Sequence, residues 1–323
     1  MGLAYQLVLS WPPWQLGGVP IEWFPGHMRE ARKEAAETLR KTDVVLEVLD
    51  ARVPFSSCNP MIEELRRKLQ RPALKILNKQ DLADPERTRQ WLAYYNAQPG
   101  VLAVALTAKQ ANAVRRLPER ALALAPHRGK PSKQLRLLIL GIPNVGKSTL
   151  MNSLLRRSVS KVGNEPALTK SQTGHDLGNH TWLIDTPGML WPDIDQGAAL
   201  KLAATHSIGP NAYDTIEIAG VLARYLVDHY AALFVRRFPV KALDASGQEL
   251  IAEIGLLRSL LGKGGVPDLE RAARALLGEF RDGTLGGISL ETPADLTAAP
   301  AAVPEQPGAL ADSESGSEPP PSA

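Results

Sequence analysis

The sequence of 323 residues contains a single cysteine, Cys58, and no apolar stretch of membrane-spanning length. One cysteine cannot form an internal disulfide, and it excludes a zinc site built from several cysteines. A membrane helix needs about 18 or more consecutive apolar residues, so we expect no segment to cross a bilayer. The first 20 residues have no basic start and contain Pro12 and Pro13, which makes them a poor signal peptide. These absences leave a cytoplasmic protein as the default expectation.

Negative charge is concentrated at the C-terminal end of the chain. Residues 292–323 contain five of the 34 acidic residues of the chain and no Lys or Arg. The rest of the chain therefore carries 37 basic residues and only 29 acidic residues. Such a surplus favours a polyanionic partner, and an ordinary solvated surface is an equal alternative. The C-terminal segment is also rich in Pro, Ala and Ser, so we expect residues 292–323 to be a disordered tail. Residues 1–20 show no periodicity and are expected to form a loose extension.

Short apolar runs alternate with amphipathic segments between residues 21 and 191. This pattern is typical of an α/β fold with a mostly parallel sheet and helices on both faces. The expected strands are Asp43–Asp50, Ala73–Leu77, Val101–Leu106, Leu135–Leu140 and Thr181–Ile184, and the expected helices are Arg29–Arg40, Met61–Gln70, Pro85–Tyr95, Ala111–Ala125 and Lys147–Arg156.

Only helical patterns follow this region, and we found no convincing strand among them. They lie at Asp195–Ser207, Asn211–Arg237, Gln248–Leu261 and Asp268–Arg281. We therefore expect one domain over residues 21–191 and a smaller all-α domain over residues 192–291.

A complete phosphate-binding motif, G-x-x-x-x-G-K-[ST], occupies Gly141–Ser148 between an expected strand and an expected helix. Its backbone N–H groups and the helix N-terminus would hold phosphate oxygens. Lys147 would reach the β- and γ-phosphates and assist catalysis, and the Ser148 hydroxyl would ligate Mg²⁺. The nucleotide contacts expected here are Pro143, Asn144, Val145, Gly146, Lys147, Ser148 and Thr149.

A second motif, D-T-P-G at residues 185–188, follows the expected strand at 181–184. An acid at the tip of that strand can hold Mg²⁺ through water, and this acid is Asp185. The Gly188 N–H can meet the γ-phosphate, which makes Gly188 a catalytic contact. Thr169 lies in the polar segment between the two motifs, where its hydroxyl would bind GTP and complete the metal shell. Thr173 and Thr181 are alternatives for that role.

The sequence N-K-x-D at residues 78–81 directly follows the expected strand at 73–77. The Asp81 carboxylate can accept from the N1–H and 2-amino groups of guanine, and adenine does not offer both donors. Asn78 and Lys79 would brace the neighbouring loop and the face of the base. Thr107-Ala108-Lys109, after the next strand, fits a loop that packs on guanine. Together these motifs predict GTP rather than ATP as the substrate.

The order of the motifs is permuted, because the guanine motif precedes the phosphate loop, whereas ordinary GTPases have the opposite order. With Trp23–Met28 (WFPGHM) and Asp50–Pro54 (DARVP), this order resembles the bacterial ribosome biogenesis GTPase A family from about Ile21 to Glu291. The resemblance implies a circularly permuted P-loop GTPase domain followed by an all-α domain. It also implies that Leu269–Glu291 belongs to a helical module that contacts ribosomal RNA.

The same resemblance bears on catalysis. Ras-like enzymes orient the attacking water with a glutamine after the metal-motif glycine, but Met189 occupies that position here. The histidine of the W-F-P-G-H-M motif is His27; the resemblance implies a catalytic role, and a helix cap is the alternative. Asn144 matches the asparagine that helps bind K⁺ in potassium-stimulated members. The family's Pro-Gly before the switch threonine is Pro166-Ala167 here, which departs from the pattern near Thr169.

The sequence thus predicts a GTP-hydrolysing assembly factor, slow alone and stimulated by the ribosomal subunit. The expected partners are the immature large (50S) ribosomal subunit, its RNA and its proteins, and the factor would time a late maturation step as a monomer. Three pairs of arginines would contact RNA phosphates. They are Arg156-Arg157, Arg236-Arg237, and Arg271 with Arg274 on one helix face. Two alternatives are a GTP-dependent protein-binding switch that does not involve RNA, and a small-subunit assembly GTPase.

Overall fold

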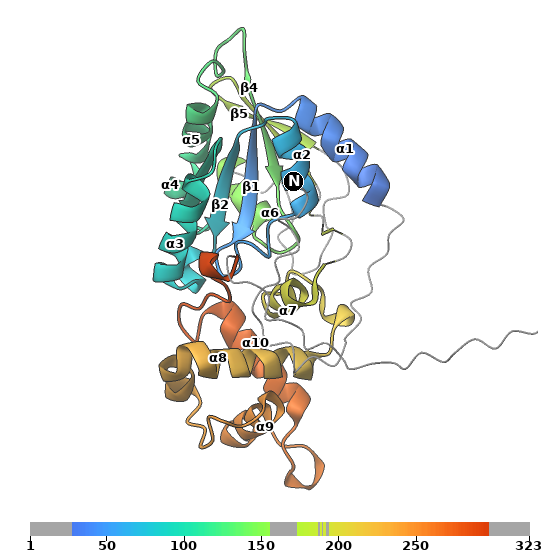
Figure 1. Ribbon diagram of the computed structural model, residues 1–323, viewed down its shortest axis with the longest axis vertical. Helices are drawn as coiled ribbons and strands as arrows, with labels where there is room; N and C mark the ends of the chain where they lie inside the picture. The colour runs from blue at the N-terminus through green and yellow to red at the C-terminus, as the bar shows by residue number, and fades with distance from the viewer. Residues whose placement is uncertain (1–27, 156–172, 187, 189, 192–193, 297–323) are drawn as a thin grey trace, which may run out of the picture.

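The computed structural model describes residues 28–155, 173–186, 188, 190–191 and 194–296 (Figure 1). Its centre is a six-stranded sheet with the order β3-β2-β1-β4-β6-β5, in which only β5 runs antiparallel to its neighbour. The strands are β1 (Val44–Asp50), β2 (Ala73–Asn78), β3 (Val101–Ala105), β4 (Leu135–Leu140), β5 (Thr173–Gly178) and β6 (Thr181–Asp185).

Helices cover both faces of this sheet, because alternate residues of its central strands point to opposite sides. Val44, Leu46 and Val48 of β1 pack with α5 (Leu117–Leu124) and α6 (Lys147–Leu155). Val45 packs on the opposite side with α1 (Met28–Arg40) and α2 (Pro60–Lys68), and Leu49 on that side packs with α3 (Pro85–Asn96). Figure 1 shows α1 and α5 on opposite sides of the strands.

A helical region follows the sheet and shares its core. It consists of α7 (Gln196–Ala204), α8 (Thr215–Arg237), α9 (Gly247–Leu257) and α10 (Leu269–Asp282) and lies beyond one end of the strands in Figure 1. One continuous cluster of buried apolar side chains runs from β4 through α8 to α9 and α10. By length and composition alone α8 could cross a membrane, but its buried side chains, including Leu222 and Leu226, belong to this core.

The chain then returns from α10 to the edge of the sheet where the parallel strands end. Gly283, with φ of 86°, ends α10 in the left-handed conformation that glycine adopts without strain. The Ile288 N–H donates to the Leu82 carbonyl (3.0 Å), and the Leu290 N–H donates to the Arg52 carbonyl (2.8 Å). Glu291 is fully buried and accepts from the Ser56 hydroxyl (2.7 Å). The end of the helical region is therefore bonded to the loops that follow β1 and β2.

The α/β fold and the helical region expected from the sequence are confirmed, but single elements differ. The helix expected over residues 111–125 is two helices, α4 (Ala111–Val114) and α5. Pro118 lies in the first turn of α5, and its ring fits a helix start better than a helix interior.

Two further differences concern segments for which no regular structure was predicted. Strand β5 has the polar sequence TGHDLG and was missed, because it is an edge strand without an apolar run. The expected disordered tail begins with an ordered 3₁₀ turn over Pro293–Leu296, and Leu296 packs partly against the cluster around Trp91. Residues 1–27 and 297–323 lie outside the described part of the chain.

Candidate nucleotide site

The phosphate motif forms the loop between the end of β4 and the start of α6. Two of its residues have left-handed backbones, Asn144 with φ of 60° and Gly146 with φ of 96°. A Cβ atom on Gly146 would lie 2.2 Å from the Asn78 amide nitrogen, so both the backbone angle and the close contact require glycine there. The loop thus turns back on itself directly in front of the first turn of α6, where helix N–H groups are free for an anion.

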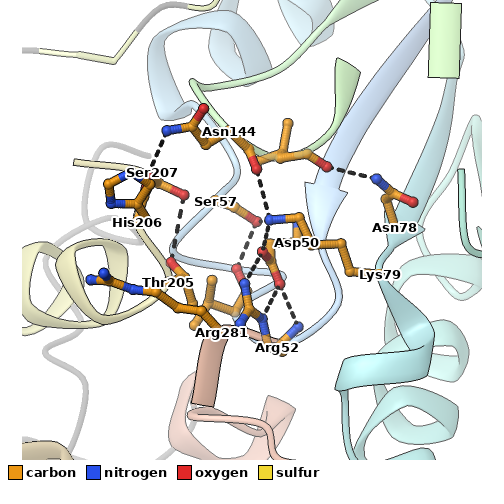
Figure 2. Close-up of polar contacts among 12 residues, drawn as sticks. Asp50, Arg52, Ser57, Asn78, Lys79, Asn144, Thr205, His206, Ser207 and Arg281 are labelled. Atoms are coloured by element: carbon orange, nitrogen blue, oxygen red, sulfur yellow. Dashed lines mark hydrogen bonds and ion pairs between the residues drawn. The ribbon is translucent and has the colours of Figure 1, made fainter. Parts of the chain in front are cut away.

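The guanine motif braces this loop through Asn78 and Lys79 (Figure 2). The Asn78 side-chain amide donates to the Val145 carbonyl (2.7 Å), and its oxygen accepts from the Ala108 N–H (2.8 Å). The Lys79 ammonium donates to the Asn144 carbonyl (2.7 Å). The three segments that were expected to surround a guanine nucleotide are therefore held together by direct hydrogen bonds.

Asp81 lies on the exposed side of this arrangement, next to the buried Thr107. The Thr107 hydroxyl donates to one Asp81 carboxylate oxygen (2.7 Å), and Asp81 itself is exposed. The Ala108 carbonyl accepts from the Ser153 hydroxyl of α6 (2.8 Å), which fixes the loop of residues 107–109 on that helix. Lys109 in the same loop is exposed. An anchored carboxylate at the surface is placed to accept from the edge of a base.

Lys147 and Asp185 form a buried ion pair at the phosphate side of the site. The Lys147 ammonium lies 2.7 Å from an Asp185 carboxylate oxygen and also donates to the Thr186 carbonyl. Both side chains are 7% exposed. Asp185 lies at the tip of β6, in register with Ile139 of the neighbouring β4. Strands β4 and β6 are parallel neighbours, so Lys147 in the segment after β4 and Asp185 at the end of β6 lie at the same edge of the sheet.

Residues suited to a divalent cation meet at this edge. Ser148 is the second residue of α6 and is half-buried, and the Asp185 carboxylate has a second oxygen in addition to the one that binds Lys147. A hydroxyl and a carboxylate are the oxygen ligands that Mg²⁺ prefers, so these residues fit the metal. Gly188 lies against the loop, since a Cβ atom there would be 3.2 Å from the Pro143 nitrogen.

The phosphate loop also contacts the helical region. The Asn144 side-chain amide donates to the His206 carbonyl, just after α7, over 2.8 Å (Figure 2). Arg281 of α10 donates to the carbonyls of Ala203 (2.8 Å) and Ala204 (2.9 Å) and so fixes the end of α7. A residue expected to bind K⁺ thus already joins the two parts of the chain through its amide nitrogen.

Two residues that contact the guanine motif or its partner were not among the predicted site residues, Asp50 and Arg52. Both belong to the D-A-R-V-P sequence, to which no role was assigned. Asp50 ends β1 and accepts from the Lys79 ammonium (2.8 Å) and from Arg52 Nη2 (2.8 Å). The signal that located Asp185, an acid at the tip of a strand beside the motif strands, applies equally to Asp50.

Burial alone would raise the pKa of Asp50, but the positive charges of Arg52 and Lys79 hold it well below its usual range. Burial lowers the pKa of Lys79, against the opposing effect of Asp50. Pairing with Arg52 and Lys79 therefore favours the charged form of the buried Asp50 carboxylate.

The predicted residues His27, Thr169 and Met189 lie outside the described residues, and so do Arg156 and Arg157, which were expected to contact RNA. Their positions relative to the phosphate loop remain predictions.

A separate buried cluster could be mistaken for a metal site. Glu47, Cys58 and Glu63 bring ligand atoms within 4.8 Å of one another. The Lys75 ammonium lies between them, 2.5 Å from Glu47, 3.3 Å from Glu63 and 3.5 Å from the Cys58 sulfur. A lysine charge thus takes the position that a cation would occupy.

Comparison with known proteins agrees with this site. Residues 136–231, which include the phosphate loop, match the family model described as 50S ribosome-binding GTPase. Ribosome biogenesis GTPase A of Bacillus cereus is 37% identical over 281 residues, which cover 84% of this chain and 94% of the relative. The mouse mitochondrial ribosome-associated GTPase 1 is 31% identical over 83% of this chain and 89% of its own length.

Solved structures show the same likeness. The GDP-bound structure of YlqF from Thermotoga maritima has a TM-score of 0.59 at 26% identity and covers 81% of this chain and 99% of its own. The GNP-bound structure of YlqF has a TM-score of 0.58 at 27% identity, with 82% and 98% covered. Guanine motif, phosphate loop and relatives agree, and the chain is a GTP-hydrolysing enzyme that belongs to the ribosome biogenesis GTPase A family.

Proposed function

We propose that this GTPase is an assembly factor that binds the immature large ribosomal subunit and leaves it when GTP is hydrolysed, at a late maturation step. The GTP-binding part of this proposal is supported by direct hydrogen bonds between the guanine motif and the phosphate loop. Asn78 donates to the Val145 carbonyl, and Lys79 donates to the Asn144 carbonyl. The ribosomal part is supported by the names of the relatives, ribosome biogenesis GTPase A and mitochondrial ribosome-associated GTPase 1.

In the proposed complex the phosphate loop and the first turn of α6 hold the triphosphate, and Asp81 accepts from the guanine base. Phosphate oxygens compete with Asp185 for the Lys147 ammonium, which lies 2.7 Å from that carboxylate. Ser148 and Asp185 would hold Mg²⁺, which neutralises charge on the β- and γ-phosphates when bound. The Gly188 N–H would donate to the γ-phosphate from its place against the loop.

Hydrolysis would be slow in the isolated protein. Met189 follows the metal-motif glycine and cannot orient a water molecule. His27 is the proposed catalytic residue, and docking on the subunit would complete the catalytic site and raise the rate. A potassium ion near Asn144 would add positive charge beside the phosphates.

The helical region would supply the RNA contacts. Arg236 and Arg271 are exposed and have no ion pair among the described residues, so their charge is available to phosphates. Arg237 instead pairs with Glu279 (2.6 Å), and Arg274 pairs with Glu270 (2.7 Å). Charge neutralisation by free arginines makes RNA binding sensitive to salt.

Co-sedimentation with purified large and small subunits at rising salt concentration tests the proposal. We expect GTP-dependent binding to the large subunit, weakened by salt and by Arg236→Ala. Arg237→Ala is the matched control, because Glu279 already occupies its guanidinium, and its effect should be smaller. Binding to neither subunit would favour a protein-binding switch, and preference for the small subunit would overturn the assignment.

Depletion in the cell tests the timing. Loss of a late large-subunit factor should lead to an immature large subunit on a sucrose gradient while the small subunit stays normal. A normal gradient after depletion would exclude the late maturation role. The proposed factor acts as a monomer in the cytoplasm.

A further inference from the structure

The residue at the end of β1 contacts the guanine motif from inside the protein. Asp50 is 0% exposed, and its carboxylate accepts four hydrogen bonds from two cationic residues. Arg52 donates from its backbone N–H (3.1 Å), from Nε (2.9 Å) and from Nη2 (2.8 Å), and Lys79 donates from its ammonium (2.8 Å). The Asp50 N–H also bonds to the Ser57 hydroxyl (3.0 Å), so both the backbone and the side chain of Asp50 are fixed.

Lys79 depends on such an anchor. Its backbone is in the left-handed conformation, with φ of 61°, and its side chain is a flexible four-carbon chain that ends in a point charge. The ammonium bonds to only one atom of the phosphate loop among the described residues, the Asn144 carbonyl (2.7 Å). The Lys79 side chain is 22% exposed, whereas Asp50 is fully buried, so the Asp50 carboxylate is the fixed partner that holds the Lys79 ammonium beside the phosphate loop.

Arg52 fixes Asp50 from the other side. Its guanidinium is 1% exposed and lies 5.0 Å over the Phe280 ring of α10, and its carbonyl accepts from the Leu290 N–H (2.8 Å). One guanidinium nitrogen, Nη1, has no hydrogen-bond partner among the described residues, and the aromatic ring offers the cation its other stabilising contact. Figure 2 shows this chain of contacts from Asn144 through Lys79 and Asp50 to Arg52.

We propose that Asp50, fixed by Arg52, is a positioning residue for guanine-nucleotide binding, of GDP and GTP alike, that holds Lys79 on the phosphate loop. Asp50 does not touch the nucleotide in this assignment and acts only through Lys79. Because Arg52 also bonds to the segment after α10, the helical region takes part in setting the nucleotide site.

The test is GDP binding, measured by titration of a fluorescent GDP analogue. Asp50→Asn keeps the shape of the side chain and removes the charge. We expect GDP affinity to fall roughly 10- to 100-fold, the range for a lost hydrogen bond to a charged group. Glu63→Gln is the matched control, because Glu63 is also a buried carboxylate, paired with Arg66 (2.6 Å) in a cluster that does not contact the phosphate loop. The control should lower thermal stability and leave GDP affinity as in the wild-type protein.

A double-mutant cycle separates positioning from general destabilisation. In the Lys79→Met background, Asp50→Asn should cause no further loss of GDP affinity, because the group through which it acts is gone. Full additivity of the two losses, or unchanged affinity of a folded Asp50→Asn variant, would overturn the proposal.

Arg52→Lys provides a second route if Asp50→Asn does not fold. Lysine keeps the charge at residue 52 but cannot form the two-point contact with Asp50. We expect an intermediate loss of GDP affinity, which should also disappear in the Lys79→Met background. Wild-type affinity of Arg52→Lys would likewise overturn the proposal.

Discussion

The side-chain amide of Asn78 donates to the carbonyl of Val145 over 2.7 Å, which joins the guanine motif directly to the phosphate loop. The same side chain accepts from the Ala108 N–H, so one asparagine spans three segments that are distant in sequence. The hydrogen bonds of this side chain therefore couple the segment expected to bind the base to the loop expected to bind the phosphates.

Asn78→Asp should weaken GTP and GDP binding alike. The aspartate keeps an acceptor for Ala108 but loses the donor, and it places a carboxylate against the Val145 carbonyl. Loss of such a buried hydrogen bond typically costs about 1–3 kcal/mol, which corresponds to roughly 5- to 150-fold in affinity. Isothermal titration with both nucleotides checks this. A loss confined to GTP would contradict it, because Asn78 does not contact the γ-phosphate side.

Asp81→Asn should change base preference. An amide offers a donor where guanine needs an acceptor, so GTP binding should weaken by several kcal/mol, and xanthosine triphosphate should regain binding. The measurement is a competition titration with both nucleotides. Glu86→Gln on α3 is the control and should leave the preference for GTP intact. Unchanged GTP affinity in Asp81→Asn would remove Asp81 from the base site.

Lys147→Ala should abolish productive GTP binding and leave Asp185 without its lysine. The ammonium lies 2.7 Å from the Asp185 carboxylate in a site where both groups are 7% exposed, so the lost charge is unscreened by solvent. Ser148→Ala should also abolish binding, because it removes the proposed Mg²⁺ ligand. Nucleotide binding and phosphate release are measured with Lys68→Ala, an exposed lysine of α2, as control. Retained hydrolysis in both variants would refute the phosphate site.

His27→Ala should lower the subunit-stimulated rate of hydrolysis by roughly 10- to 1000-fold while GTP affinity stays nearly intact. The rate is measured with and without large subunits. K⁺ should support hydrolysis better than Na⁺, and Asn144→Ala should reduce that difference. Normal stimulated turnover of His27→Ala would leave His27 as a helix cap, and the catalytic group would have to be sought elsewhere, for instance in ribosomal RNA.

Stability at acid pH should depend on Asp50. Arg52 and Lys79 hold the pKa of the folded carboxyl well below its usual range despite burial, so the folded state resists protonation. In the unfolded chain an aspartate protonates near pH 3.9, so the free energy of unfolding should fall as pH decreases from about 5. Denaturant unfolding of Asp50→Asn should show a shallower fall between about pH 5 and pH 3. Parallel curves for the two proteins would contradict the ion pairing.

Local chemistry along the chain determined the fold class and the nucleotide motifs. Apolar runs separated by amphipathic segments predict a parallel sheet, and Lys147, Asp81 and Asp185 each follow or end such a run. Strand ends of a parallel sheet meet at one edge, so the sequence pattern alone predicts that these residues lie at one site. The break before Pro118 was missed, although proline favours the first turn of a helix.

The tertiary structure decided what holds the site together. Asp50 and Lys79 are 29 residues apart, and Asn78 and Val145 are 67 apart; no pattern of period 2 or 3.6 relates residues over such separations. The polar strand β5 exists only because β6 offers it an edge, and Arg52 has a partner in Phe280 only because α10 returns to the sheet. Sequence periodicity determines which residues are buried and at which strand end they lie, whereas the pairing of buried polar groups follows from where distant segments pack against one another.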